Sequence, residues 1–452
     1  MLSSAYISTR SIVILAVLMM DVPSYAQLEN AFWQDQDNIN AAFVVNPAFL
    51  TSGNAVIALP FLTVSQVGNN QIDNGPFKLV ESELDRSFKG EKGVDLQNTF
   101  GSAHEEGNLL SRQANLLGGA ISSRVRSKKH PERRITVRLA YLSNNTLDIV
   151  YSGRFAAMAL SPLFSMEVPY TSNVTNNFEL RYMDYRAIAL GGTIEVRPLQ
   201  TYVGVNLKLL GGSSFIVADI NNGITTVLSK GTDLVFSERA PNSNFLNGKG
   251  VAIDVGAVHR ISRVWSLMAS LVDLGFISWP DAERFEVRNN QEILLGLEPL
   301  NELTGQLFLV SAYAPLLNDL RSDGSSNEKV RTSLQGRTNL GVEGLIGRWG
   351  VHVLVQKAIR NWSSSADATV IASKASYWLL DRKSGRLGFS VGVRYGSDTE
   401  FSITSSLRAD LKVVDFYFGL NGLSDGSQPY GRSMLMLGIQ INTAGITDRD
   451  RL

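Results

Sequence analysis

The sequence predicts an all-β chain that closes into a single transmembrane antiparallel β-barrel of about 14 strands. Three observations predict this fold. Apolar and polar residues alternate in runs of about ten residues, close to the roughly 9–11 residues of a strand tilted across a bilayer. The polar positions of these runs hold glycine, serine and single charges, as a solvated lumen requires. No segment after residue 26 is apolar for long enough to form a membrane-spanning helix.

The N-terminal residues have the pattern of a cleaved export signal. Arg10 precedes the apolar run Ser11–Met20, and Ser24–Ala26 supplies the small residues of a cleavage site. This run is much shorter than the roughly 20 residues of a spanning helix, which argues against a membrane anchor. We therefore expect a signal peptide at residues 1–26, cleavage that leaves Gln27 as the first residue, and location in the cell outer membrane.

Composition excludes several classes of function. The 452 residues include 42 basic and 42 acidic side chains, so the basic excess typical of nucleic-acid binding is missing. The sequence has no cysteine, which excludes disulfides, thiolate metal sites, thiol catalysis and a lipid-anchored cysteine. We expect no nucleic-acid partner.

Residues 27–52 differ in character from the rest of the mature chain. They predict a short amphipathic helix and then a turn at Asn46, Pro47 and Ala48, because proline favours an extended or turn conformation for the residue before it. After this segment alternation dominates to the end of the chain. Residues 53–452 show no domain boundary and no short repeat, so we expect them to form the barrel as one unit.

Alternation identifies the expected strands, and about 14–16 can be counted. The clearest runs are 135–141, 202–209, 251–260, 351–356, 386–396, 401–404, 414–420 and 434–441. Less regular candidates are 54–64, 113–125, 178–190, 215–220, 225–236, 264–279, 338–346 and 368–379. Long polar connections are expected at roughly 68–108, 143–177 and 279–327.

The strand at 386–396, RLGFSVGVRYG, shows what the apolar side must contact. In a β-sandwich that side packs on a second sheet, whereas in a membrane barrel it faces lipid. The length of the runs favours the barrel, since soluble strands are usually about 5–6 residues long. We expect one face toward lipid and the other toward the lumen. The lipid face comprises Leu387, Phe389, Val391 and Val393, and the lumen face comprises Arg386, Ser390 and Arg394.

Aromatic residues near the expected strand ends also favour a membrane barrel. Such barrels carry girdles of aromatic side chains at both membrane interfaces. The candidates are Tyr141, Tyr202, Trp265, Trp279, Trp349 and Tyr395. Each of them taken singly is compatible with ordinary core packing.

The order of several segments resembles a family of outer-membrane barrels of Bacteroidetes-type bacteria, similar to the long-chain fatty-acid transporter (FadL-like) barrels. The resemblance rests on NPAFL at 46–50, VGVNLKLLGG at 203–212, GVAIDVGAV at 250–258 and SLVDLGFISW at 270–279. It implies that Asn46, Pro47 and Ala48 belong to a hatch at 27–52 that lies inside the barrel. It also implies passage of a hydrophobic molecule, or a structural or export role. The chain departs from many such barrels by continuing with NTAGITDRDRL after the last strand.

Single charges within the runs are the candidate lumen residues. They are Arg138, Lys208, Asp254, Asp273, Arg386, Arg394 and Asp415. Asp254 and Asp273 stand out because each interrupts an otherwise apolar strand, where a charge toward lipid would be costly. They predict either a ligand or gate in the lumen, or internal salt bridges to an arginine such as Arg260 or Arg394, which lumen charges usually form.

No motif of enzymatic chemistry stands in the required context. The four histidines lack the spacing of a metal site, and G-x-S-x-G at 422–426 lies between two expected strands rather than before a helix. We expect no catalytic residue, metal or cofactor. The expected partners are outer-membrane lipid and a hydrophobic small molecule. The alternatives are a non-transporting structural or secretion-complex barrel and a soluble secreted or periplasmic β protein.

Overall fold

The computed structural model describes the strands of the sheet and one short segment before them. The described residues are 43–49, 55–58, 61–68, 108–125, 135–151, 178–196, 200–221, 224–230, 247–288, 326–359, 369–382, 385–396, 399–411, 414–421 and 434–442. The expected signal peptide, the G-x-S-x-G pattern at 422–426 and the C-terminal tail after residue 442 lie outside them.

All described strands belong to one antiparallel sheet. They are β1 (Ala55–Ala58), β2 (Phe61–Gly68), β3 (Asn108–Val125), β4 (Ile135–Tyr151), β5 (Phe178–Val196), β6 (Thr201–Asn221), β7 (Ile224–Lys230), β8 (Gly248–Arg260), β9 (Trp265–Arg288), β10 (Ser326–Ser333), β11 (Arg337–Ile346), β12 (Trp349–Ala358), β13 (Thr369–Arg382), β14 (Gly385–Gly396), β15 (Thr399–Leu411), β16 (Val414–Asn421) and β17 (Met434–Asn442).

The sheet closes on itself. β1 and β2 both pair with β17 on one side and with β3 on the other. β7 and β8 together fill the place between β6 and β9, and β10 and β11 both pair with β9. With three places shared in this way, the 17 described strands occupy fourteen positions in the ring. The prediction of an all-β antiparallel barrel is confirmed.

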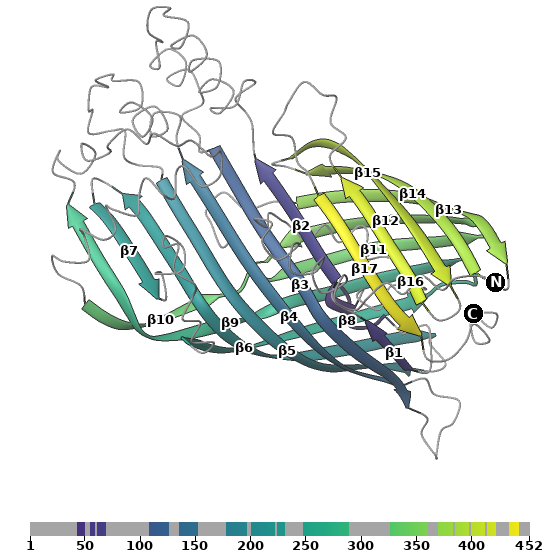
Figure 1. The fold of residues 1–452 in the computed structure, drawn as a ribbon, viewed down its shortest axis with the longest axis horizontal. Helices are drawn as coiled ribbons and strands as arrows, with labels where there is room; N and C mark the ends of the chain where they lie inside the picture. Colours follow the sequence, from purple (N-terminus) through teal and green to yellow (C-terminus); the bar gives the residue numbers. More distant parts are fainter. Residues whose placement is uncertain are drawn as a thin grey trace, which may run out of the picture.

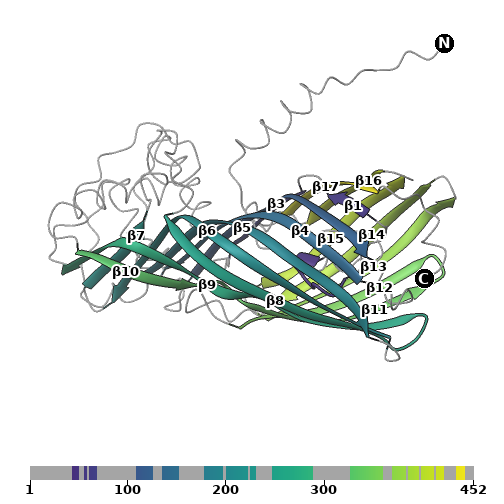
Figure 2. The same ribbon diagram turned by 90° about the horizontal axis from the view of Figure 1, so that it is seen from below.

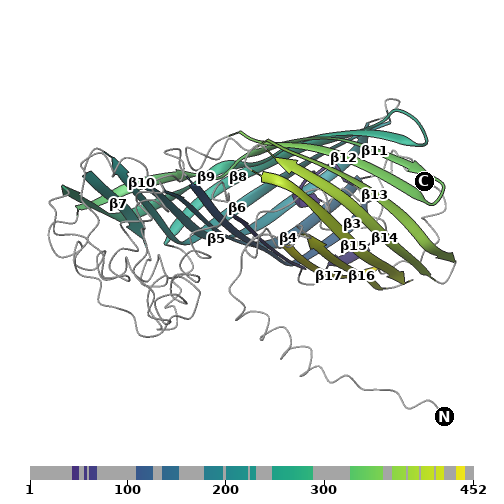
Figure 3. The ribbon, with the colours of Figure 1, turned by 90° about the horizontal axis from the view of Figure 1, so that it is seen from above.

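The strands run obliquely around the barrel, with β2–β6 in one wall and β8, β9 and β11–β14 in the opposite wall (Figure 1). The views from below and above place β7 and β10 far from β13 and β14 (Figures 2 and 3). A tilt of this kind is needed to close a sheet into a barrel.

Exposure alternates along the strands with the apolar side outward. In β14 the exposed fractions of Phe389, Val391 and Val393 are 43%, 42% and 38%, whereas Ser390 between them is only 5% exposed. In β6, Leu207 and Leu209 are likewise exposed. A large outward apolar surface suits lipid contact rather than water. No helix among the described residues is long and apolar enough to span a membrane.

A charge placed on this outward surface is expected to destabilise the barrel. Val391 lies in the middle of β14, so Val391→Arg should cost about 2–4 kcal/mol in a lipid bilayer. Ser390→Ala, on the inner face, loses a hydrogen bond with Ser406 and should cost only about 1 kcal/mol. Urea unfolding in phospholipid vesicles measures both, and an equal cost at the two positions would contradict outward lipid contact.

Two expectations about the aromatic residues and the connections were wrong. Trp265 and Trp349 are exposed at the starts of their strands, as a girdle requires, but Tyr202 and Trp279 face inward and are buried. The expected connections at 143–177 and 279–327 begin too early, since β4 continues to Tyr151 and β9 to Arg288. The reason is that the polar residues at these strand ends still pair with neighbouring strands.

An apolar cluster lies on the inner face of β5, β6, β9 and the β10–β11 break. We call it the Trp279 cluster, and its largest members are Met183, Tyr185, Phe215, Ile277, Trp279 and Leu334. The ring centres of Phe215 and Trp279 are 4.7 Å apart. The indole Nε1 of Trp279 donates to Thr332 Oγ1 at 2.8 Å. This part of the inner face is therefore apolar.

Candidate functional site

The Asn46 turn is folded against the inner face of the barrel. Phe43, Val45, Ala48 and Phe49 are all buried. Within the turn, Asn46 Oδ1 accepts from the backbone N–H of Ala48 at 2.9 Å, and its carbonyl accepts from that of Phe49 at 3.1 Å. A short polar side chain that bonds its own backbone in this way stabilises a turn. We refer to residues 43–49 as the docked segment.

Two wall residues hold the second half of the docked segment by its carbonyls. Arg138 of β4 donates to the carbonyl of Pro47 at 3.0 Å and also to that of Phe49. Thr193 of β5 donates to the carbonyl of Pro47 at 2.6 Å. The guanidinium of Arg138 also lies 5.4 Å from the ring centre of Phe43. The two terminal nitrogens of this buried guanidinium thus donate to main-chain oxygens, which offsets part of the cost of burying the charge.

Polar residues from three further strands hold the first half. Asn206 of β6 donates to the carbonyl of Phe43 at 3.3 Å. Ser270 of β9 donates to the carbonyl of Val45 at 2.6 Å, and Asn339 of β11 donates to the same oxygen at 3.2 Å. Carbonyls at positions 43, 45, 47 and 49 therefore each have a partner in the wall, so the segment is bound at a defined register.

Two glycines make room for the turn. Gly204 of β6 pairs directly with Gly256 of β8. A Cβ atom at Gly204 would lie 2.0 Å from the Pro47 carbonyl oxygen, and one at Gly256 would lie 2.0 Å from Asn46 Oδ1. Any side chain at either position would collide with the docked segment. The sequence thus leaves a recess in the wall where the turn enters.

A buried cluster of four charges lies beside the docked segment. Lys208 Nζ of β6 is 2.9 Å from Asp254 Oδ1 and 2.6 Å from Asp273 Oδ1. Arg337 of β11 is 2.6 Å from the other oxygen of Asp273. We call these four residues the charge cluster. Two cations and two anions balance, so the cluster is neutral inside the wall.

Irregular backbone brings these charges together. Asp273 has a φ of 58° and lies at a bulge between β8 and β9, and its N–H donates to Asp254 Oδ1 at 2.8 Å. Beside it, β10 ends at Ser333 and β11 begins at Arg337, which places Arg337 opposite the bulge. Bulges commonly re-aim a side chain in this way.

The two aspartates form internal salt bridges, but Arg260, one of the two arginines expected as a partner, does not take part in them. The pairing cations are Lys208 and Arg337, and the guanidinium of Arg260 lies instead 5.4 Å from the ring centre of Tyr202. The reason is distance along the strand, since Arg260 stands at the end of β8, six residues from Asp254. The side chain of Arg394, the other expected partner, lies outside the described residues.

The remaining predicted lumen charges are not part of this site. Arg386 of β14 is half-buried and lies 5.9 Å from the ring centre of Trp378. Asp415 of β16 is buried and pairs in register with Asp410 of β15. These residues belong to the strands β14–β16 and not to the strands β6, β8, β9 and β11 that carry the charge cluster.

The docked segment, the charge cluster and the Trp279 cluster follow one another along the inner face of β6. Gly204 faces the turn, Asn206 bonds both the segment and Asp254 Oδ2, Lys208 carries the cluster, and Leu210 belongs to the Trp279 cluster. Asn206 therefore links the segment to the charges. The charge cluster therefore separates the docked segment from the Trp279 cluster.

Several residues of this site were not singled out from the sequence. They are Thr193, Asn206, Ser270, Arg337 and Asn339. The only sign of these residues in the sequence is that each is a polar residue at an inward position of an alternating strand. Many other inward residues have the same property, so it does not identify the site. Among the described residues, no group of three or more histidine, aspartate or glutamate side chains is arranged to hold a metal ion.

Comparisons with known proteins give one family and several barrels. The model of the family described as "Family of unknown function (DUF5723)" matches residues 47–421. The structure is similar to the Pseudomonas putida toluene transporter TodX, with 9% identity, a TM-score of 0.44, and coverage of 89% of this chain and 92% of that one.

Two further solved structures are similar at lower scores. A Pseudomonas aeruginosa FadL homologue has 10% identity and a TM-score of 0.36, with coverage of 93% of this chain and 100% of that one. The translocator domain of the autotransporter NalP from Neisseria meningitidis has 9% identity and a TM-score of 0.33, with coverage of 97% and 100%. No curated protein matches the sequence.

Proposed function

The chain belongs to the family of unknown function DUF5723, and we propose that it is an outer-membrane barrel with a hatch that binds or passes a hydrophobic small molecule. The observation that carries the proposal is the docked segment, whose carbonyls are bound by side chains of five strands. In this proposal the signal peptide ends at Ala26, residues 27–52 form the hatch, and the docked segment is its anchored part.

The Trp279 cluster supports a hydrophobic ligand. Ligand sites are lined mainly by apolar and aromatic side chains with a few polar groups. Here Phe215, Trp279 and Met183 lie inside the barrel, with Thr332 as a polar group among them. A channel for ions or sugars would instead have a polar interior at this level.

The charge cluster supports a second function, a barrel that transports nothing. Its four charges are paired and buried between the docked segment and the Trp279 cluster. Opening a path there requires separating ion pairs in a low-dielectric interior, which is costly. In that case the barrel serves as a structural or secretion partner. A soluble β protein is disfavoured by the outward apolar surface.

Deletion of the docked segment tests the hatch. Removal of residues 43–49 should leave an assembled barrel, because the pairing of β1–β17 does not involve them. We expect a larger single-channel conductance in planar bilayers than for the intact chain. A matched control removes the same number of residues from 289–325, a connection between β9 and β10. Unchanged conductance after deletion of 43–49 would show that the segment is not a plug.

Binding of a hydrophobic probe separates the two functions. N-phenyl-1-naphthylamine should bind the detergent-solubilised protein and should bind more weakly to Trp279→Ala, which removes the largest buried side chain of the cluster. If deletion of residues 43–49 raises the conductance but the intact protein does not bind the probe, the non-transporting barrel is favoured. Recovery of the protein from cells without detergent would contradict both.

A further inference from the structure

Three basic residues form one row across the neighbouring strands β5, β6, β8, β9 and β10. Arg186 pairs with Gly211, and Gly211 pairs with Lys249. Lys249 in turn pairs with Ser278, and Ser278 pairs with Arg331. Directly paired residues of neighbouring strands point to the same face of a sheet. The three cations therefore share one face, spaced about 10 Å apart because two strand separations lie between them. We call them the basic row.

This face is the outward one. One row nearer the middle of the barrel, Ile188, Leu209 and Val251 are paired across the same strands and are 52%, 58% and 44% exposed. Phe276 of β9 continues that apolar row. No register shift falls between the two rows on these strands. The basic row thus follows immediately at the edge of the apolar surface.

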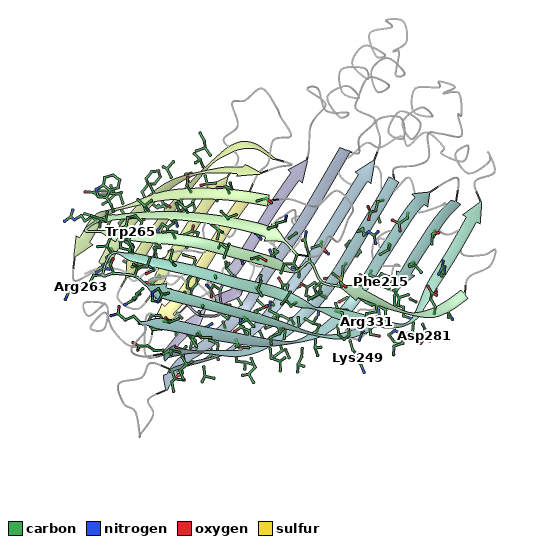
Figure 4. All side chains as sticks on the ribbon, turned by 180° about the vertical axis from the view of Figure 1, so that it is seen from behind. Phe215, Lys249, Arg263, Trp265, Asp281 and Arg331 are labelled. Atoms are coloured by element: carbon green, nitrogen blue, oxygen red, sulfur yellow. The ribbon has the colours of Figure 1, made fainter. Side chains whose placement is uncertain are left out.

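The cations are positioned to meet a ligand from outside. The Arg331 guanidinium lies 3.6 Å from the ring centre of Phe276, which holds it flat against the wall while the side chain stays exposed. Lys249 is exposed as well. Figure 4 shows Lys249 and Arg331 near each other, with Arg263 and Trp265 at the opposite end of the barrel. Two acidic groups are also near. Asp184 stands two residues before Arg186 and interacts with it electrostatically, and Figure 4 places the exposed Asp281 beside Lys249 and Arg331.

The row lies toward the end of the barrel that carries the long connections. Lys249 is the second residue of β8, just after the connection 231–247, and Ser278 and Arg331 lie within β9 and β10, which the connection 289–325 joins. At the other end the turns are short, as between β11 and β12. Outer-membrane barrels have short periplasmic turns and longer extracellular loops. By this rule the basic row stands at the outer leaflet.

We propose that Arg186, Lys249 and Arg331 bind the phosphate groups of an outer-leaflet lipid, a phosphorylated glycolipid whose acyl chains lie on the apolar row below. The inference rests on the proposed insertion in the outer membrane. Charge complementarity and continuity with the apolar surface select a lipid, because a headgroup phosphate attached to acyl chains satisfies both rows at once.

Lipid binding by the purified protein tests the proposal. The delipidated protein in detergent is titrated with bisphosphorylated lipid A and with the same lipid after removal of its phosphates, and native mass spectrometry counts the bound lipid. We expect binding of the phosphorylated form, weakened about fivefold by Lys249→Gln and by a similar factor by Arg331→Gln, which corresponds to the usual effect of one basic residue at an anionic membrane surface.

The control variants carry the same change at the opposite end. Arg263→Gln and Arg348→Gln replace exposed cations in short turns and should leave lipid binding unchanged. If the control variants weaken lipid binding as much as Lys249→Gln and Arg331→Gln do, the basic row is not the site. Equal binding of the lipid without phosphates would also overturn the proposal. Displacement by an acidic protein but not by lipid would overturn it as well.

The same purified protein can show whether the lipid site fails separately from the proposed function. A protein that needs detergent, shows a heat-modifiable barrel on gels and ignores phosphorylated lipid would overturn the lipid site and leave the membrane barrel intact. A protein that stays monodisperse without detergent would overturn both.

Discussion

Lys208→Met is expected to lower the free energy of unfolding by about 3–5 kcal/mol, because it removes one partner from a buried ion network. Lys208 contacts Asp254 at 2.9 Å and Asp273 at 2.6 Å, and Asp254 is fully buried. Without the ammonium group, Asp254 keeps only the Asn206 amide and one backbone N–H as donors. Urea unfolding in phospholipid vesicles measures the change.

A second variant and a control test whether the loss of stability comes from the unpaired buried carboxylate. Lys208→Met combined with Asp254→Asn should recover part of the loss, because the unpaired carboxylate is then also gone. Arg181→Met breaks two partly exposed ion pairs, with Glu179 and with Asp219 at 3.2 Å, and should cost no more than about 1 kcal/mol. A loss at Lys208 as small as at Arg181 would show that the charge cluster does not stabilise the barrel.

The face of the sheet to which each side chain points was predictable wherever apolar and polar residues alternate without interruption. Along β6 the sequence predicts Val205, Leu207 and Leu209 on one face and Asn206 and Lys208 on the other. The structure exposes the first three and buries the last two. An exposed apolar face on one side and close packing on the other require side chains to alternate in type along the strand, so the signal is strong.

The alternation fails where the backbone is irregular. A bulge opposite Asp184 and Tyr185 shifts β6 by one residue at Ser213, which turns Phe215 inward. The bulge at Asp273 and the break between β10 and β11 act in the same way on β9 and Arg337. Glycines stand at these points, namely Gly211, Gly212, Gly275 and Gly336. The chain has 39 glycines, many of them within regular strands, so a glycine alone does not locate a bulge.

The sequence predicts many of the residues that form the site, but it does not predict which of them contact one another. Asn46, Pro47, Ala48, Arg138, Lys208, Asp254 and Asp273 were all candidates, yet which of them meet depends on strand register. Arg138 binds the Pro47 carbonyl across 91 residues of sequence, and Asn339 binds that of Val45 across 294. Contacts over such separations follow from closure of the sheet, which a pattern within one strand does not encode.

Gly204→Val is expected to release the docked segment from an intact barrel. The new Cβ would lie 2.0 Å from the Pro47 carbonyl oxygen and 2.5 Å from the Ala48 nitrogen. These are main-chain atoms held by Arg138 and Thr193, so they cannot turn aside as a flexible side chain would. The strand itself should tolerate the change, because valine favours β-structure.

Thiol labelling measures this release, since the chain has no cysteine of its own. Val45→Cys places one thiol at a position that is 2% exposed in the docked segment. In the otherwise native background a maleimide should react slowly. With Gly204→Val the rate should rise at least about a hundredfold, because losing two hydrogen bonds to a charged group, worth about 1.5–3 kcal/mol each, makes the undocked state dominant. Val205→Ile enlarges the adjacent outward residue of β6 and should leave labelling slow. Fast labelling in every background would mean that the segment is not held in the barrel, and slow labelling in every background would mean that the recess at Gly204 does not control its docking.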